Sequence, residues 1–174
     1  MIRLEFQRLS EPTAEIASTI ERWENDPDLV PLIRRCRSQE DQRRHVAVTV
    51  DTIIDRLQRN HIFLLYAEGK LVGECSYQID PPQCFHKVGG TAWFGINIGE
   101  KSARHRGIGA DTLRFLEEEV RLQGMKRIEL GVFEFNENAH RLYAKLGYQE
   151  IGRIKDFTFR DGRMWPDIRM EKIL

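Results

Sequence analysis

The feature that most constrains the fold is a glycine-containing loop, Arg104–Ala110, that lies between a strand pattern and a helix pattern. Before the loop, Thr91–Ile98 is rich in β-forming residues, and after it Ala110–Gln123 repeats apolar residues at helical spacing. A helix that begins directly after such a loop presents unpaired N–H groups and the positive end of its dipole to the loop. The sequence therefore predicts an α/β fold in which this helix end faces an anionic ligand, and a pyrophosphate is the natural candidate.

The remaining patterns complete a single domain over residues 1–174. Ile2–Leu9 alternates apolar and polar residues, as a first strand does, and Pro12 suits the first turn of a helix that runs to about Asn25. A second helix is expected over about Gln39–Asn60, after breaks at Pro27 and Pro31. We predict an α/β arrangement with a central mixed, mostly antiparallel sheet of about six to seven strands and about four flanking helices. Further strands are expected at His61–Ala67, Leu71–Ile79, Lys126–Phe135, Tyr148–Phe159 and Met164–Ile173, with a helix at Asn138–Leu146.

Charge and cysteine content exclude several classes of function. The 27 basic and 27 acidic residues balance, so no overall basic field would draw the chain to nucleic acid or to an anionic membrane. No apolar run approaches the roughly 20 residues of a membrane span, and the start of the chain does not resemble a signal peptide, so we expect a cytoplasmic protein. Cys36, Cys75 and Cys84 show no CxxC spacing and the histidines are scattered, so we expect no metal site.

The glycine loop alone leaves its role open. It lacks the GxxxxGK[ST] pattern of a Walker loop, and Thr112 stands where a dinucleotide-binding GxGxxG motif has its third glycine. Gly107 and Gly109 allow a ligand to approach the backbone closely, but they would also suit an ordinary turn before a helix. The loop therefore needs a second motif before it indicates a particular ligand.

That second motif follows at Asn136–Tyr148, which reads Asn-x-x-Ala-x-x-Leu-Tyr-x-Lys-Leu-Gly-Tyr. Together with Arg-x-x-Gly-x-Gly-Ala in the loop, it resembles the two cofactor motifs of the GNAT superfamily of N-acetyltransferases. Residues 132–136 and 159–162 are similar to the branch that contains ribosomal-protein-alanine and spermidine N-acetyltransferases. The resemblance covers roughly Thr91–Leu174, about half of the chain, and it implies a GNAT-like α/β fold and acetyl-CoA as co-substrate.

The resemblance also implies roles for particular residues. Ile96 and Ile98, at the end of their strand, would offer backbone groups to the pantetheine arm of acetyl-CoA. Asn136 would contact the same arm where two adjacent strands separate, and Tyr143 matches the family's tyrosine near the thioester sulfur. The pyrophosphate would be bound chiefly by backbone N–H groups of the loop, formed by Arg104, Arg106, Gly107, Ile108, Gly109 and Ala110.

The chemistry of acetyl transfer gives two of these side chains a reason. A phenol such as Tyr143 can donate a hydrogen bond to a departing thiolate without ionising, although its helical spacing would also let it pack in the core. A protonated amine needs a base, for which Glu74 and Glu134 are candidates. Either carboxylate would also suit a strand that faces solvent, and water could relay the proton instead.

We therefore expect direct acetyl transfer to an amine in a ternary complex. The acceptor stays open between polyamines, amino acids, peptide N-termini and antibiotics, and the helices between Pro12 and Asn60 are expected to bind it. Trp23, in that region, is either a substrate contact or a packing aromatic. Two alternatives remain, a sensor that binds acyl-CoA without turnover and a nucleotide-binding enzyme that uses the same loop. A homodimer is common in this family.

Overall fold

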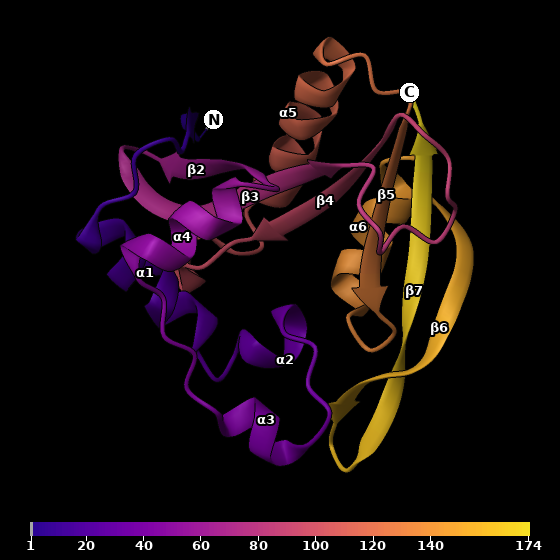
Figure 1. Cartoon of the computed structure of the whole chain (residues 1–174), viewed down its shortest axis with the longest axis horizontal. Coiled ribbons are helices and arrows are strands. Elements are labelled where there is room, and N and C mark those ends of the chain that lie inside the picture. Colours follow the sequence, from indigo (N-terminus) through magenta and orange to yellow (C-terminus); the bar gives the residue numbers. More distant parts are fainter. Residues whose placement is uncertain (1) are drawn as a thin grey trace.

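Seven strands rich in β-branched and aromatic residues form one twisted sheet in the computed structural model, which describes residues 2–174 (Figure 1). Their order is β1-β2-β3-β4-β5-β7-β6, and every neighbouring pair is antiparallel except β4 and β5, which are parallel. The strands are β1 (Leu4–Arg8), β2 (His61–Ala67), β3 (Lys70–Ile79), β4 (Thr91–Asn97), β5 (Arg127–Phe133), β6 (Gln149–Arg160) and β7 (Arg163–Ile173).

Helices cover both faces of this sheet because successive strand residues point to opposite sides. On one face, Phe63 and Tyr77 pack with apolar residues of α5 and α6. On the other face, Ile62 and Leu64 pack with α1 and α4 around the fully buried Trp23. No helix in residues 2–174 is long and apolar enough to cross a membrane. The helices are α1 (Ala14–Glu24), α2 (Val30–Ile33), α3 (Gln39–Arg43), α4 (Val50–Leu57), α5 (Ile108–Leu122) and α6 (Glu137–Lys145).

The parallel pair β4 and β5 is joined only at its beginning. Its register ends at Trp93 opposite Glu129, although β4 continues to Asn97 and β5 to Phe133. At the joined end, the fully buried Glu129 accepts a hydrogen bond from Arg127 Nη2 at 2.7 Å. It also accepts the backbone N–H groups of Phe85 and His86, which fasten the connection before β4 to the same point. The two strands therefore separate into a V whose vertex is fixed by buried charges.

The connection between α2 and α3 is bound to the edge of the sheet. Cys36 N donates to Thr158 Oγ1 at 3.1 Å, and Phe159 N donates to Cys36 O at 2.7 Å. Gln42 Nε2 also donates to Phe159 O, at 2.7 Å. Figure 1 shows α2 and α3 beside the β6–β7 hairpin as a result, although the two segments lie far apart in the sequence. The early helical region and the C-terminal hairpin therefore form one continuous wall.

The predicted fold class is confirmed, but the structure has six α-helices over residues 2–174 where about four were expected. The prediction of one helix over Gln39–Asn60 is wrong, because the chain is not helical between Arg44 and Thr49 and divides the region into α3 and α4. Thr49 begins α4 with a capping box in which its side chain and that of Thr52 bond to each other's backbone N–H.

The starts of three further helices differ from expectation. Pro31 does not simply break the chain, since it lies in the first turn of the short helix α2, where its missing N–H costs nothing. Thr13 caps α1 with its side chain, so Pro12 precedes the helix instead of lying in its first turn. The helix after the glycine loop begins at Ile108, two residues earlier than predicted, which places Gly109 inside α5.

Candidate active site

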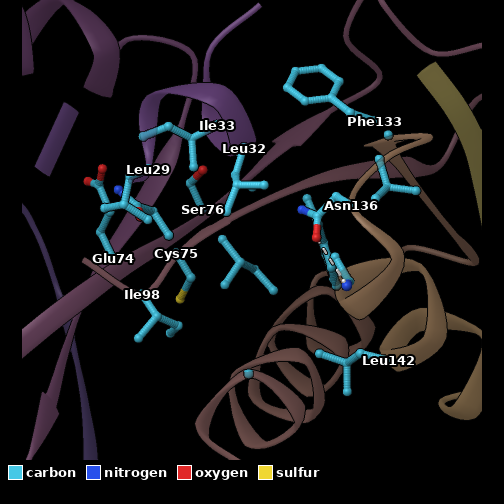
Figure 2. A pocket seen from close by; sticks show the side chains of 18 of the residues that line it. Leu29, Leu32, Ile33, Glu74, Cys75, Ser76, Ile98, Phe133, Asn136 and Leu142 are labelled. Carbon is cyan, nitrogen blue, oxygen red and sulfur yellow. Dashed lines mark hydrogen bonds between the residues drawn. The ribbon is translucent and has the colours of Figure 1, made fainter. Parts of the chain in front are cut away.

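A cavity of about 710 Å³ opens where β4 and β5 separate. Figure 2 shows Glu74, Leu29 and Ile33 on one side of it and Asn136 and Leu142 on the other. One wall thus comes from α2, β3 and the residues around them, and the other from β5 and α6. The volume lies in the usual range for a ligand site.

The first turn of α5 reaches this cavity at Gly109 and offers backbone N–H groups, whereas Ile108 lines a separate surface depression and Gly107 lines neither. Gly107 is the N-cap residue, with φ of +82° and no side-chain cap, and His105 before it also has a positive φ of 59°. Within residues 2–174, the N–H groups of Gly107, Ile108 and Gly109 have no hydrogen-bond acceptor, whereas that of Ala110 bonds to Gly107 O at 3.0 Å. Three consecutive donors at the positive end of a 15-residue helix suit a phosphate group.

The two glycines of the loop have different structural roles. Gly107 supplies the left-handed backbone conformation that starts the helix, and a Cβ there would meet no atom within 4 Å. Gly109 has no such conformation, but a Cβ on it would lie 3.2 Å from Leu142 Cδ2. Gly109 therefore lets α5 and α6 approach each other beside the cavity. Ile108 between them buries its side chain in the core, so only its backbone can face a ligand.

The two arginines of the loop lie in different places. Arg104 lines the cavity, but its guanidinium donates to Ile98 O at 3.0 Å and to Gly99 O at 2.7 Å, and it lies 3.4 Å from Asp26 Oδ2. Arg104 therefore braces the loop from within. Arg106 is exposed and lines a separate surface depression that shares no residue with the cavity.

Ile96 and Ile98, at the end of β4 and just beyond it, both line the cavity, as predicted for the edge that faces the pantetheine arm. Asn136 also lines it and caps α6, with Oδ1 accepting Ala139 N at 3.3 Å. Its amide nitrogen makes no hydrogen bond within residues 2–174, so it is available to a ligand. The three residues lie along the two arms of the V.

Tyr143 lines the cavity from α6, so it is not simply a core residue. Burial, and to a smaller extent the negative charge of Asp167, raise the pKa of its phenol to about 12. The hydroxyl therefore stays protonated near neutral pH and can donate a hydrogen bond or a proton.

The two candidate bases lie in different places. Glu74 lines the cavity from β3, and burial, together with the negative charge of Glu24, raises the pKa of its carboxyl to about 7, while Arg56 opposes this shift. Glu134 does not line the cavity and pairs with Arg153 at the surface. A carboxyl that titrates near neutral pH inside a cavity is suited to accept a proton.

Sequence reasoning missed Asn97. Its Oδ1 is buried without a hydrogen-bond partner within residues 2–174, and the residue lines the cavity. Asn97 is the register partner of Glu74 in the antiparallel pair of β3 and β4, so the two side chains project from the same face of the sheet. Buried acceptors of this kind are normally satisfied, so an unpaired one beside a candidate base indicates a place for an N–H group. Only a polar residue late in an otherwise apolar strand could have suggested it.

Trp23 is a packing aromatic. It is fully buried, its Nε1 donates to Glu100 Oε1 at 2.9 Å, and a Cβ on Gly99 would come within 2.1 Å of its ring. It is not among the residues that line the cavity. Trp23 therefore supports the segment that leads from β4 to the glycine loop. Within residues 2–174, no group of three or more histidine, cysteine, aspartate or glutamate residues could hold a metal ion.

Two curated bacterial proteins resemble part of the chain. A probable spermine N(1)-acetyltransferase of Bacillus subtilis subsp. natto is 35% identical over 95 residues, and a spermine/spermidine N(1)-acetyltransferase of Bacillus subtilis strain 168 is 34% identical over the same length. Each match covers 54% of this chain and 62% of the relative, so it spans less than two thirds of either curated protein.

Solved structures share the fold over almost the whole chain. Ribosomal-protein-alanine N-acetyltransferase of Brucella melitensis has a TM-score of 0.72 and 21% identity, covering 98% of this chain and 99% of that one. Spermidine N-acetyltransferase of Vibrio cholerae, in complex with CoA and spermine, has a TM-score of 0.73 and 17% identity, covering 98% and 95%.

The model of the acetyltransferase (GNAT) family matches residues 20–148, about three quarters of the chain. The matched region includes both sequence motifs, the separated strands β4 and β5 and both walls of the cavity. The chain belongs to the GNAT family of acetyltransferases.

Proposed function

We propose that the protein is an acetyl-CoA-dependent N-acetyltransferase. The observation that carries the proposal is the convergence of three groups on one cavity: the unpaired N–H group of Gly109 in the first turn of α5, the phenol of Tyr143 and the carboxyl of Glu74. They come from three separate parts of the sequence, and direct acetyl transfer needs an anion site, an acid and a base together.

In this proposal, the first turn of α5 binds the pyrophosphate of acetyl-CoA, and the open edges of β4 and β5 hold its pantetheine arm. Asn136 contributes its side-chain amide to the same arm. Bound acetyl-CoA supplies an activated acetyl thioester. The N–H groups on the open edge of β4 can donate to the thioester carbonyl oxygen and stabilise the negative charge that develops there.

The protein's own groups then move two protons. Ionised Glu74 takes a proton from the acceptor ammonium and leaves a neutral amine, which forms the new C–N bond as the C–S bond breaks. Tyr143 donates its proton to the departing sulfur and is reprotonated, through solvent, by the proton that the nitrogen still carries in excess. Glu74 then releases its proton to solvent, which leaves one proton set free in each turnover. A carboxyl whose pKa burial raises to about 7 can accept and release a proton near neutral pH, as a catalytic base must.

Two measurements test the proposal. Acetyl-CoA should raise the melting temperature, whereas ATP and NAD should not, because only a ligand that binds the native state stabilises it. Release of free CoA thiol should then be followed with a panel of amines that includes spermine, amino acids and peptide N-termini. Stabilisation by acetyl-CoA without acetylation of any amine would favour the sensor, and stabilisation by ATP or NAD alone would favour a nucleotide enzyme.

A further inference from the structure

The proposed acetyl transfer leaves the acceptor amine unspecified. The side chains on one side of the cavity indicate which kind of amine would bind there. We call this side the acceptor wall. It combines apolar side chains with charged ones. Its apolar members are Leu29, Leu32, Ile33 and Ile62, and its charged members are Glu24, Arg34, Arg56 and Glu74.

The carboxylates of the acceptor wall are too few for a polycation. Glu24 is held by Arg56 through two contacts, 2.5 Å from Oε1 to Nη1 and 3.1 Å from Oε2 to Nη2. Of the described residues in the wall, Glu74 alone has a carboxylate without an ion pair. A polyamine brings several ammonium groups, and each one that enters the cavity needs its own counter-charge. Since Glu74 serves the reacting amine, no unpaired carboxylate is left in the wall for the others.

Arg34 adds a positive charge to the wall that no carboxylate compensates. Its guanidinium donates to Arg44 O at 2.9 Å, to Glu24 O, and to Asn25 Oδ1 at 3.4 Å. These are carbonyl oxygens, and Arg34 forms no ion pair within residues 2–174. The group is therefore held in place while its charge stays available to an anion.

Arg34 is the one of the five arginines between residues 30 and 45 that lines the cavity. The preceding residues 21–29 carry four acidic side chains and one basic one, so the acceptor wall depends on the charge of Arg34 itself and not on a broad positive field. The hydrogen bonds of Cys36 with Thr158 and Phe159 hold the chain just after Arg34 against the sheet edge, which fixes Arg34 beside the cavity.

Resting on the proposed acetyl transfer, we propose that the acceptor is a small primary amine with an apolar body and a carboxylate group. Its nitrogen lies between Glu74 and the unpaired Oδ1 of Asn97, its body lies against Leu29 and Ile33, and its carboxylate faces Arg34. The acceptor is small because the cavity of about 710 Å³ also holds the pantetheine arm.

Matched amines test this assignment on the wild-type protein. Phenylalanine and phenethylamine differ by the carboxylate alone, and spermine represents the polycations. We expect kcat/KM for phenylalanine to exceed that for phenethylamine by at least about tenfold, the usual effect of a hydrogen bond to a charged group, with spermine below both. Equal or better turnover of phenethylamine or spermine overturns the assignment and leaves acetyl transfer intact. Absence of transfer to these three amines, while another amine or a peptide N-terminus is acetylated, also overturns the assignment, whereas absence of transfer to every amine of the wider panel, with acetyl-CoA bound, contradicts the proposed function itself.

Variants then identify the anchor. Arg34→Gln should remove most of the preference for phenylalanine over phenethylamine, whereas Arg34→Lys, which keeps the charge, should retain part of it. Arg43→Gln is the matched control, since Arg43 is exposed on α3 and does not line the cavity. Because the ratio of two substrates is measured on each variant, a general loss of folding does not imitate the result. An unchanged ratio in Arg34→Gln rejects Arg34 as the anchor.

Discussion

Replacing Glu74 by glutamine tests whether the cavity holds its carboxyl in an unfavourable environment. The folded chain raises the pKa of Glu74 from its ordinary value of 4.5 to about 7. The folded protein therefore keeps this proton to higher pH than the unfolded chain does. The free energy of unfolding therefore falls as pH rises from about 4.5 to about 7, because ionising Glu74 costs more in the folded state than in the unfolded chain.

The size of the effect follows from the same shift. A change from 4.5 to about 7 corresponds to about 3 kcal/mol of unfolding free energy, which the wild type loses once Glu74 is fully ionised. Glutamine has the shape of the protonated acid and cannot ionise. We expect Glu74→Gln to match the wild type in stability near pH 4 and to exceed it by up to about 3 kcal/mol at pH 8.5.

Urea unfolding at a series of pH values measures this difference. Glu134→Gln is a suitable control, because Glu134 pairs with Arg153 at the surface, where an ion pair contributes less than about 1 kcal/mol. Glu74→Gln should also have lost most of its acetyl transfer, whereas Glu134→Gln should keep it. A stability difference that does not change between pH 4 and pH 8.5 would show that Glu74 is not strained by its surroundings, and the argument for it as a base near neutral pH would lose its support.

Two further predictions concern the proposed acid and the glycine loop. Tyr143→Phe should lower kcat at least about tenfold and leave acetyl-CoA affinity nearly unchanged. Tyr148→Phe is the control, because it removes a hydroxyl bonded to Glu117 at 3.0 Å and should affect stability and not kcat. Stopped-flow kinetics measure kcat and calorimetry measures affinity, and a wild-type kcat in Tyr143→Phe would reject Tyr143 as the acid. Gly107→Ala should cost about 1 kcal/mol of stability and weaken acetyl-CoA binding, because alanine strains the left-handed start of α5. Gly124→Ala, at φ of +77° after the other end of α5, should cost the same stability without weakening binding, and equal affinities in the two variants would remove the loop from the site.

The elements that the sequence predicts well are those whose signals are local. The turns at Glu68-Gly69 and Asp161-Gly162 have positive φ at both residues, as a tight hairpin turn requires, and the strands on either side begin and end within a few residues of expectation. The region from Gln39 to Asn60 was harder, because Val46 continues the helical spacing of the apolar residues of α4 although it lies in a non-helical piece, and because α3 contains no apolar residue. Thr49 ends that piece through a capping box with a second threonine, which is a weaker signal than the usual acidic partner.

The residues of the candidate site also divide into those with a local sequence signal and those without one. The glycine loop, Asn136 and Tyr143 belong to two continuous motifs, so a resemblance can name them. The acceptor wall is assembled from α1, α2, α4, β2 and β3, and its members share no local pattern. The pairing of Glu74 with Asn97 depends on how the connection 80–90 sets the register of β3 and β4, and this connection contains no short turn that would fix it.

The vertex of the V has a consequence for how the cavity is shaped. Glu129 fastens β5, the connection before β4 and Arg127 at one buried point, and all of these lie at the joined end of the two strands. Any widening or narrowing of the gap must therefore leave this joined end in place and change only the separation of the open ends of β4 and β5. The affinity for a molecule bound between the two strands thus depends in part on residues that do not contact it.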